Sequence, residues 1–156
     1  MALFDTMWNP EALRKACEDI RQIDEDTLEF LEDTLVDVVR DYMEMEAAHV
    51  RFLEMAGDLE EARSAVGEHL VSFAAYLTAI YGPKVGIALS IIVTNKMDDI
   101  FGVIKDSIAP SDGEGAMRMS RLRRVLLESN AVYFRYLKEM VYYAVLKHKS
   151  DKEEKG

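Results

Sequence analysis

Four side chains in the middle of the chain have the types and spacing to bind a divalent metal. Glu46 and His49 are three residues apart, so a helix places the carboxylate and the imidazole on one face. A helical hairpin that turns at Gly57 would bring Glu68 and His69 to about the same height. Carboxylate oxygens and imidazole nitrogens are common ligands of divalent metals. The sequence therefore predicts a candidate metal site at Glu46, His49, Glu68 and His69.

The candidate site contains one Glu-x-x-His motif, whereas ferritin-like di-iron bundles use two. Ferritin-like di-iron proteins hold their metals with two Glu-x-x-His motifs and two further glutamates, and this chain has only Glu46-x-x-His49. Glu29 and Glu32 resemble a fragment of the magnesium motif of MazG-like nucleotide pyrophosphohydrolases, but no E-x-x-D follows. The sequence favours core histidines paired with neighbouring glutamates. A metal-dependent helical-bundle enzyme, ferritin-like or nucleotide-hydrolase-like, is the second hypothesis. No other cofactor is indicated.

Two further motifs match parts of enzyme signatures. Arg63 and His69 fit the R-x(4–6)-H pattern of HEPN-type ribonucleases, which are small dimeric helical bundles, and such a ribonuclease is a further alternative. Ser64 stands where that pattern usually has Asn, Asp or His. Residues 95–98 read NKMD, as in the guanine-binding element of GTPases, but the chain has no GxxxxGK[ST] phosphate loop. With no complete catalytic set, the sequence leans towards a protein that is not an enzyme.

Three arginines, Arg118, Arg121 and Arg124, form a candidate anion-binding group in the last third of the chain. The formal net charge is −10, and residues 1–61 alone hold 18 acidic and 5 basic side chains. Nucleic-acid binding depends on neutralising phosphates, so this charge disfavours nucleic acid as a partner. We expect the arginines to lie against the acidic helices, and anion binding is the alternative.

The residues above must be positioned by helices, because the chain has the caps, breakers and periodicity of an all-α protein. Helix starts are marked by capping residues or proline, and helix ends by glycine: Asn9-Pro10, Asp26 with Glu29, Gly57, and Gly82-Pro83. Between them, apolar residues recur every three or four positions, including the seam Leu28, Leu31, Leu35, Val38, Tyr42, Met45 and His49. These signals predict five helices, over residues 10–22, 26–56, 58–81, 83–108 and 116–149.

The predicted fold is a single-domain, all-α bundle of about five helices over residues 1–156, with a long C-terminal helix. Residues 1–8 form an apolar arm before the first helix. Residues 109–115 are rich in Pro, Ser, Asp and Gly and predict a flexible loop. Residues 150–156 form a charged tail that we expect to fray. Residues 85–93 are apolar on all sides, which predicts a buried central segment.

The last predicted helix has more apolar surface than one stripe of contact covers. It carries Tyr133, Tyr136 and Tyr143, and tyrosine is enriched at protein interfaces. Phe4 and Trp8 add an apolar patch ahead of the first helix. We therefore expect these five residues at an interface with another chain, unless the helix is the centre of its own bundle. The leading hypothesis is a non-enzymatic protein that binds a protein partner or itself, as a homo-oligomer or as a subunit of a larger assembly.

Composition indicates a cytoplasmic protein. Cys17 is the single cysteine, so no intramolecular disulfide can form, which fits a reducing compartment. Residues 1–5 lack the basic and long apolar regions of a signal peptide. The longest apolar run is shorter than the roughly 20 residues that a transmembrane helix needs, so no membrane partner is expected.

Overall fold

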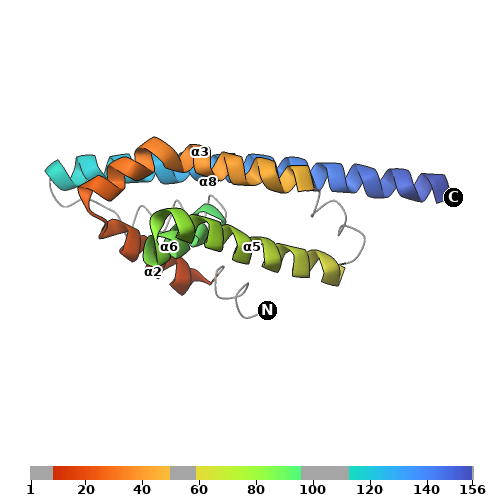
Figure 1. The fold of residues 1–156 in the computed structure, drawn as a ribbon, viewed down its shortest axis with the longest axis horizontal. Helices are drawn as coiled ribbons and strands as arrows, with labels where there is room; N and C mark the ends of the chain where they lie inside the picture. Colours follow the sequence, from red (N-terminus) through yellow and green to blue (C-terminus); the bar gives the residue numbers. More distant parts are fainter. Residues whose placement is uncertain (1–8, 50–58, 96–112, 156) are drawn as a thin grey trace.

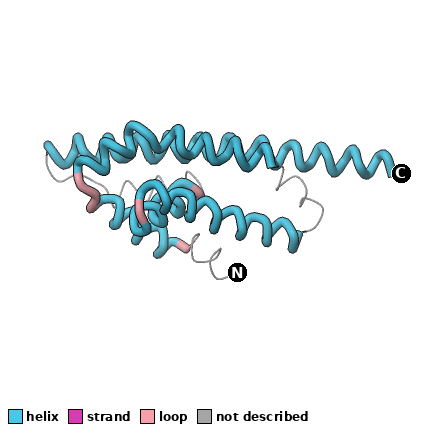
Figure 2. The backbone as a smooth tube through the Cα atoms, viewed as in Figure 1, coloured by secondary structure: helices cyan, strands magenta, loops and turns pink. Residues whose placement is uncertain are grey.

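The computed structural model describes residues 9–49, 59–95 and 113–155, and these form five helices (Figure 1). The helices are α2 (Pro10–Arg21), α3 (Glu25–His49), α5 (Leu59–Tyr81), α6 (Pro83–Val93) and α8 (Gly113–Lys155). The described residues contain no strand (Figure 2). The predicted all-α bundle with a long last helix is confirmed. Residues 1–8, with Phe4 and Trp8, and Gly57 lie outside the described residues.

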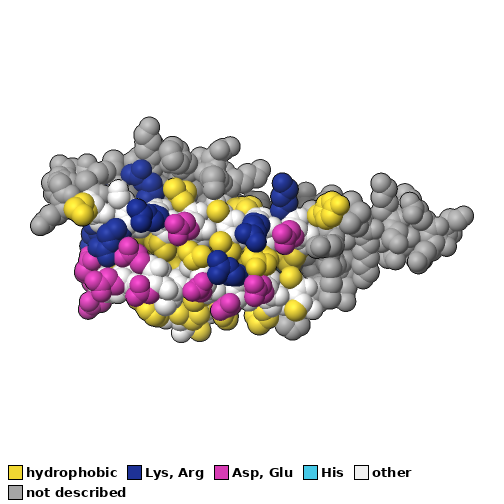
Figure 3. Space-filling model, turned by 90° about the horizontal axis from the view of Figure 1, so that it is seen from above, with side chains coloured by type: hydrophobic (Ala, Val, Ile, Leu, Met, Phe, Trp, Pro, Cys, Tyr) yellow, Lys and Arg dark blue, Asp and Glu magenta, His cyan; other side chains and the backbone are white. Residues whose placement is uncertain are grey.

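Helices α3 and α8 lie side by side and form one layer of the bundle (Figure 1). Arg121 contacts Glu25 at the start of α3, and Tyr136 contacts Glu44 near its end. Residue numbers therefore increase in the same direction along both helices, so α3 and α8 are parallel. Figure 3 looks onto this layer and shows acidic and basic side chains next to one another along it.

The second layer consists of α5, α6 and α2 (Figure 1). α5 runs antiparallel to α3, because its last residue, Tyr81, bonds to Thr34 while His69, earlier in α5, lies against Tyr42, later in α3. α6 folds back on α5, and α2 packs on α6. The second layer thus encloses one side of the α3/α8 pair.

The first two helices begin at capping side chains. The Asn9 side chain accepts a 2.8 Å hydrogen bond from the Glu11 amide, and Pro10 is the first helical residue, as predicted. For α3 the predicted cap at Asp26 is wrong, because Asp24 accepts a 2.7 Å bond from the Thr27 amide. The Thr27 side chain and then its amide lower the pKa of the Asp24 carboxyl by hydrogen bonding. The helix therefore starts at Glu25, one residue earlier than expected.

The corner between α5 and α6 depends on two glycines. Gly82 has φ of +91°, a conformation that glycine adopts without steric cost, and Pro83 then starts α6. Gly86 lies where α6 crosses α5. A Cβ at this position would be 2.5 Å from the backbone nitrogen of Thr78, too close for any side chain to fit without a shift of the helices. Glycine at 86 thus allows backbone-to-backbone contact between the two helices.

Helix boundaries in the second half differ from those predicted. The helix predicted over 83–108 ends at Val93, with Thr94 as its cap, and residues 96–108 lie outside the described residues. α8 begins at Gly113, so residues 113–115 of the predicted loop 109–115 are helical, and residues 109–112 are not described. The charged residues 150–155 continue α8 instead of fraying.

The core is built from buried aliphatic and aromatic side chains of all five helices. Burying each Leu, Ile or Phe stabilises the fold by roughly 1.5–3 kcal/mol. Fully or almost fully buried members include Leu13, Ile20, Leu28, Leu35, Phe73, Leu77, Leu89, Ile92, Leu122 and Leu126. This core holds the three helices that carry the candidate site residues in a fixed register.

Candidate functional site

Two of the four predicted metal ligands, Glu46 and His69, are buried among polar side chains between α3, α5 and α8. We call Tyr42, Glu46, His69 and Tyr133 the polar core cluster. The Tyr42 hydroxyl donates to Glu46 Oε1 at 2.9 Å, one turn along α3. His69 Nε2 and the Tyr133 hydroxyl are also 2.9 Å apart, and the histidine tautomer decides which atom donates. All four side chains are at most 3% exposed.

The other two predicted ligands do not join this cluster in the described structure. Glu68 is exposed, because it lies one helical position, or about 100°, from the buried His69. His49 is the last residue of α3, and its side chain lies outside the described residues. Within the described residues, no group of three or more His, Cys, Asp or Glu side chains could hold a metal ion. The described part of the chain therefore supplies two of the four proposed ligands.

Aromatic rings surround the polar core cluster. Phe73 stacks on His69 at 6.1 Å and on Tyr133 at 5.5 Å between centroids, and Tyr42 lies 5.0 Å from Phe73. Burial raises the pKa of the Tyr133 hydroxyl, and the nearby Tyr42 and Glu46 raise it further, so this hydroxyl stays protonated. A solute cannot reach these buried atoms without separating the helices. The cluster is suited to fixing three helices in register.

The Tyr133 hydroxyl should contribute measurably to stability. Replacing Tyr133 by Phe leaves His69 Nε2 buried without this partner, and we expect the free energy of unfolding to fall by about 1–3 kcal/mol. Tyr136→Phe is a matched control on the same helix, because that hydroxyl donates to Glu44 at 2.8 Å near the surface, where water can replace it. Urea titration of both variants measures the difference. Equal effects would contradict a buried role for the Tyr133–His69 bond.

The three candidate anion-binding arginines have different surroundings. Arg121 lies 2.5 Å from Glu25 and from Glu32, and Arg118 donates to the Ile23 carbonyl oxygen. The hydrogen bond from Arg121 lowers the pKa of the Glu32 carboxyl. Arg124 is exposed. Arg121 thus binds the acidic helix α3, as expected, whereas Arg118 binds the connection between α2 and α3. Of the three, only Arg124 presents its side chain largely to solvent.

The predicted interface tyrosines occupy different environments. Tyr133 is 2% exposed and belongs to the polar core cluster, so we correct its assignment from an interface to the bundle interior. Tyr136 is half-buried against Glu44. The side chain of Tyr143 lies outside the described residues. Tyr142, which was not among the candidates, is 61% exposed, more than any other tyrosine whose side chain the structure describes.

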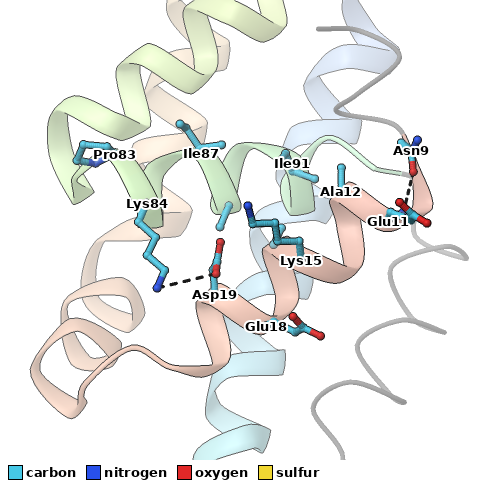
Figure 4. Close-up of a pocket in the computed structure, with 12 residues that line it drawn as sticks. Asn9, Glu11, Ala12, Lys15, Glu18, Asp19, Pro83, Lys84, Ile87 and Ile91 are labelled. Atoms are coloured by element: carbon cyan, nitrogen blue, oxygen red, sulfur yellow. Dashed lines mark hydrogen bonds and ion pairs between the residues drawn. The ribbon is translucent and has the colours of Figure 1, made fainter. Parts of the chain in front are cut away.

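A groove between α2 and α6 was not predicted from the sequence (Figure 4). It has a volume of about 810 Å³. Small and aliphatic side chains form its apolar part: Ala12, Ala16, Pro83, Ile87, Ala88 and Ile91. Ile87 is 50% exposed, which corrects the expectation that residues 85–93 are buried on all sides. The sequence signal was present in the alanines of α2, since small side chains on a packed helix leave space above them.

Comparisons with known proteins give no relative for this chain: no family model, no curated protein and no solved structure matches it. None of the described helices is both long enough and apolar enough to cross a membrane.

Proposed function

We propose that the protein acts by binding other protein chains, as a homo-oligomer or as a subunit of a larger assembly, and not by catalysis. The observation that carries this proposal is the length of α8. Tyr136 is level with Glu44, so the end of α3 at His49 is level with about Val141. α8 continues for 14 residues beyond that point to Lys155, or roughly 21 Å at 1.5 Å per residue. Figure 1 shows this segment extending past α3 and α5.

The sequence at the base of this extension is apolar on every side. Residues 140–146 read MVYYAVL, seven apolar or aromatic residues in succession. A surface helix needs only one apolar stripe to pack on its own bundle. Tyr142 in this run is 61% exposed. A contact with a second chain would cover this surface and stabilise the last turns of α8, since short helices are marginal in water without packing.

The polar core cluster favours a structural role over catalysis. Glu46 and His69 are the acid–base groups in it, and both are 3% exposed and lie between packed helices. Catalytic groups must reach a substrate within hydrogen-bond distance. The cluster instead joins α3, α5 and α8, and so supports the surface that we propose to bind other chains.

We also place the protein in the cytoplasm. Cys17 is the single cysteine and is fully buried, and burial raises its pKa to about 11. The thiol is therefore protonated and shielded at neutral pH, and the chain uses no intramolecular disulfide for stability. This chemistry suits a reducing compartment.

Light scattering at micromolar concentration tests the proposal. We expect the mass of a dimer or a higher oligomer, and we expect it to persist or tighten as salt rises, because screening weakens repulsion between chains of net charge −10. Tyr142→Glu should weaken association by about tenfold or more, or about 1.4 kcal/mol. Met117→Glu is the control, since Met117 is also exposed but lies near the other end of α8. A monomer mass for the unmodified chain across the salt range would contradict self-association.

A monomer that also fails to retain any protein partner through α8 would remove the whole proposal. Affinity purification with the unmodified chain and with the Tyr142→Glu variant makes that comparison. A partner lost in the variant and kept in the Met117→Glu control would support a role as a subunit.

A further inference from the structure

The direction of the hydrogen bond between His69 and Tyr133 determines which nitrogen of the imidazole carries its proton. We infer that the Tyr133 hydroxyl donates to His69 Nε2, so that the neutral imidazole carries its proton on Nδ1 and has no lone pair left for a metal ion. The two bonded atoms are 2.9 Å apart, and the side chains are 3% and 2% exposed. This inference goes beyond the proposed function, because it concerns the bundle interior and holds whether or not α8 binds another chain.

The burial of the Tyr133 hydroxyl sets the direction of the bond. Burial, together with Tyr42 and Glu46 nearby, raises the pKa of this hydroxyl, so the oxygen keeps its hydrogen at neutral pH. Within the described part of the chain, His69 Nε2 is the one acceptor at hydrogen-bond distance from the hydroxyl. If Nε2 donated to the tyrosine oxygen instead, the hydroxyl hydrogen would be buried without an acceptor. The cost of an unpaired buried donor favours donation by the hydroxyl by about fivefold or more.

Aromatic rings pack around this hydrogen bond and offer the hydroxyl hydrogen no alternative acceptor of similar strength. The Tyr133 ring stacks on Phe73 at 5.5 Å and lies edge to face with Phe134 at 5.2 Å between centroids. Phe73 also stacks on the His69 ring at 6.1 Å. Rings packed in this way restrict the rotation of the imidazole, so Nε2 stays directed at the hydroxyl.

The assigned tautomer engages both nitrogens of His69. A metal ion binds the lone pair of a neutral imidazole nitrogen. On Nδ1 the proton occupies that position, and on Nε2 the lone pair accepts the bond from Tyr133. Glu46 Oε1 likewise accepts from the Tyr42 hydroxyl at 2.9 Å. Each of the two predicted ligands that the structure brings together is thus bonded to a tyrosine hydroxyl, which favours a core histidine over a metal ligand.

Nitrogen NMR of the imidazole tests the inference directly. A long-range correlation between ring hydrogens and ¹⁵N separates protonated from unprotonated nitrogens, and the coupling pattern distinguishes Nδ1 from Nε2. The chain has three histidines, so the double variant His49→Gln, His148→Gln identifies the signals of His69. In the unmodified chain at neutral pH we expect a protonated Nδ1 and an unprotonated Nε2.

Two additions to this experiment test the donor and the metal separately. Tyr133→Phe should shift the His69 Nε2 signal, because it removes the donor. Tyr136→Phe is the matched control, since that hydroxyl donates to Glu44, and it should leave the His69 signals unchanged. One equivalent of Zn²⁺ added to the unmodified chain should also leave them unchanged.

Three results would overturn the inference. A proton on Nε2, or on both nitrogens, in the unmodified chain would reverse the assigned direction of the bond. An Nε2 signal that ignores Tyr133→Phe would remove Tyr133 as the donor. Loss of the Nε2 signal on adding Zn²⁺ would show that this nitrogen is available to a metal. The first and third results are measured on the unmodified chain, so they decide the matter even if Tyr133→Phe does not fold.

Discussion

Replacing Gly86 by alanine should destabilise the protein by about 3 kcal/mol or more, above the usual range for one added methyl group. The new Cβ would collide with the Thr78 Cα and lie 2.5 Å from the Thr78 nitrogen and 2.7 Å from the Leu77 carbonyl carbon. These are backbone atoms of α5, so no side-chain rotation relieves the overlap and α6 must move as a unit. That movement would disturb the packing of Leu89 and Ile92, which are fully buried.

Gly67 provides a control of opposite sign. It lies within α5, and a Cβ there would have no atom within 4 Å other than those of its own helix and chain neighbours. Gly67→Ala should therefore stabilise the protein by about 0.5–1 kcal/mol through the higher helix propensity of alanine. Urea unfolding followed by circular dichroism measures both variants. Similar stability for Gly86→Ala and Gly67→Ala would mean that α5 and α6 are not in backbone contact at Gly86.

Local signals were sufficient to predict where most helices begin or end. Asn9-Pro10 begins α2, and Gly82-Pro83 separates α5 from α6, as predicted. Both depend on the chemistry of adjacent residues: a side-chain oxygen that accepts from a free amide, a fixed proline φ, or a glycine at positive φ. Such interactions act over one helical turn, so a single sequence contains all that determines them.

The end of α6 and the start of α8 could not be predicted in this way. Residues 83–108 have no breaker near Val93, and the helix ends there because Thr94 and Asn95 bond back to carbonyls of α6 while α8 contributes another donor. Gly113 and Gly115 indicated a loop, yet they lie in the first turn of α8. Glycine disfavours a helix by only about 1 kcal/mol, and the apolar residues that follow provide enough packing to offset it.

The candidate site was predicted in part, and the error in α3 has a geometric cause. A strict seven-residue repeat placed Met45 in the seam, but Met45 is 42% exposed and Glu46 is 3% exposed. Glu46 is 18 residues after Leu28, which is five complete turns of about 3.6 residues, so it shares the buried face of Leu28. A seven-residue repeat drifts by about 20° per repeat on a straight helix. Between Leu28 and Met45 this drift is large enough to turn Met45 away from the core and to bring Glu46 onto the buried face.

Hydrogen bonds between side chains on different helices could not be predicted from the sequence. His69 was a candidate ligand and Tyr133 a candidate interface residue, and nothing in their local patterns indicated that they bond to each other across α5 and α8. Asn130 was not singled out at all. It lies on α8 with a fully buried amide, and its partners are 35 and 37 residues away. A buried amide with distant partners is recognised only when the helices are in place.

Asn130 should prove to be a strong link between α8 and the end of α6. Its side-chain nitrogen donates to the Val93 carbonyl at 2.7 Å and to the Asn95 carbonyl at 2.8 Å. Asn130→Ala removes both bonds at buried acceptors, and we expect a loss of about 2–4 kcal/mol. Ser129→Ala is the control, since Ser129 is equally buried but donates only to Val125 of its own helix. We expect Ser129→Ala to cost less than about 1 kcal/mol, because the helix already uses that carbonyl.

Asn130→Asp tests whether the hydrogen bonds donated by the Asn130 amide, and not the shape of the side chain, stabilise this contact. Aspartate has nearly the size of asparagine but no N–H group, and it would direct a carboxylate at two carbonyl oxygens. We expect a loss of about 3–5 kcal/mol at neutral pH, as for other unpaired buried charges. Burial and the carbonyls raise the pKa of this carboxyl in the folded state, so the penalty is full above that pKa and shrinks as pH falls towards the unfolded value of about 4. Urea titrations of the Asp and Asn forms at several pH values measure this. An aspartate as stable as asparagine at neutral pH would show that the amide protons do not hold α6 to α8.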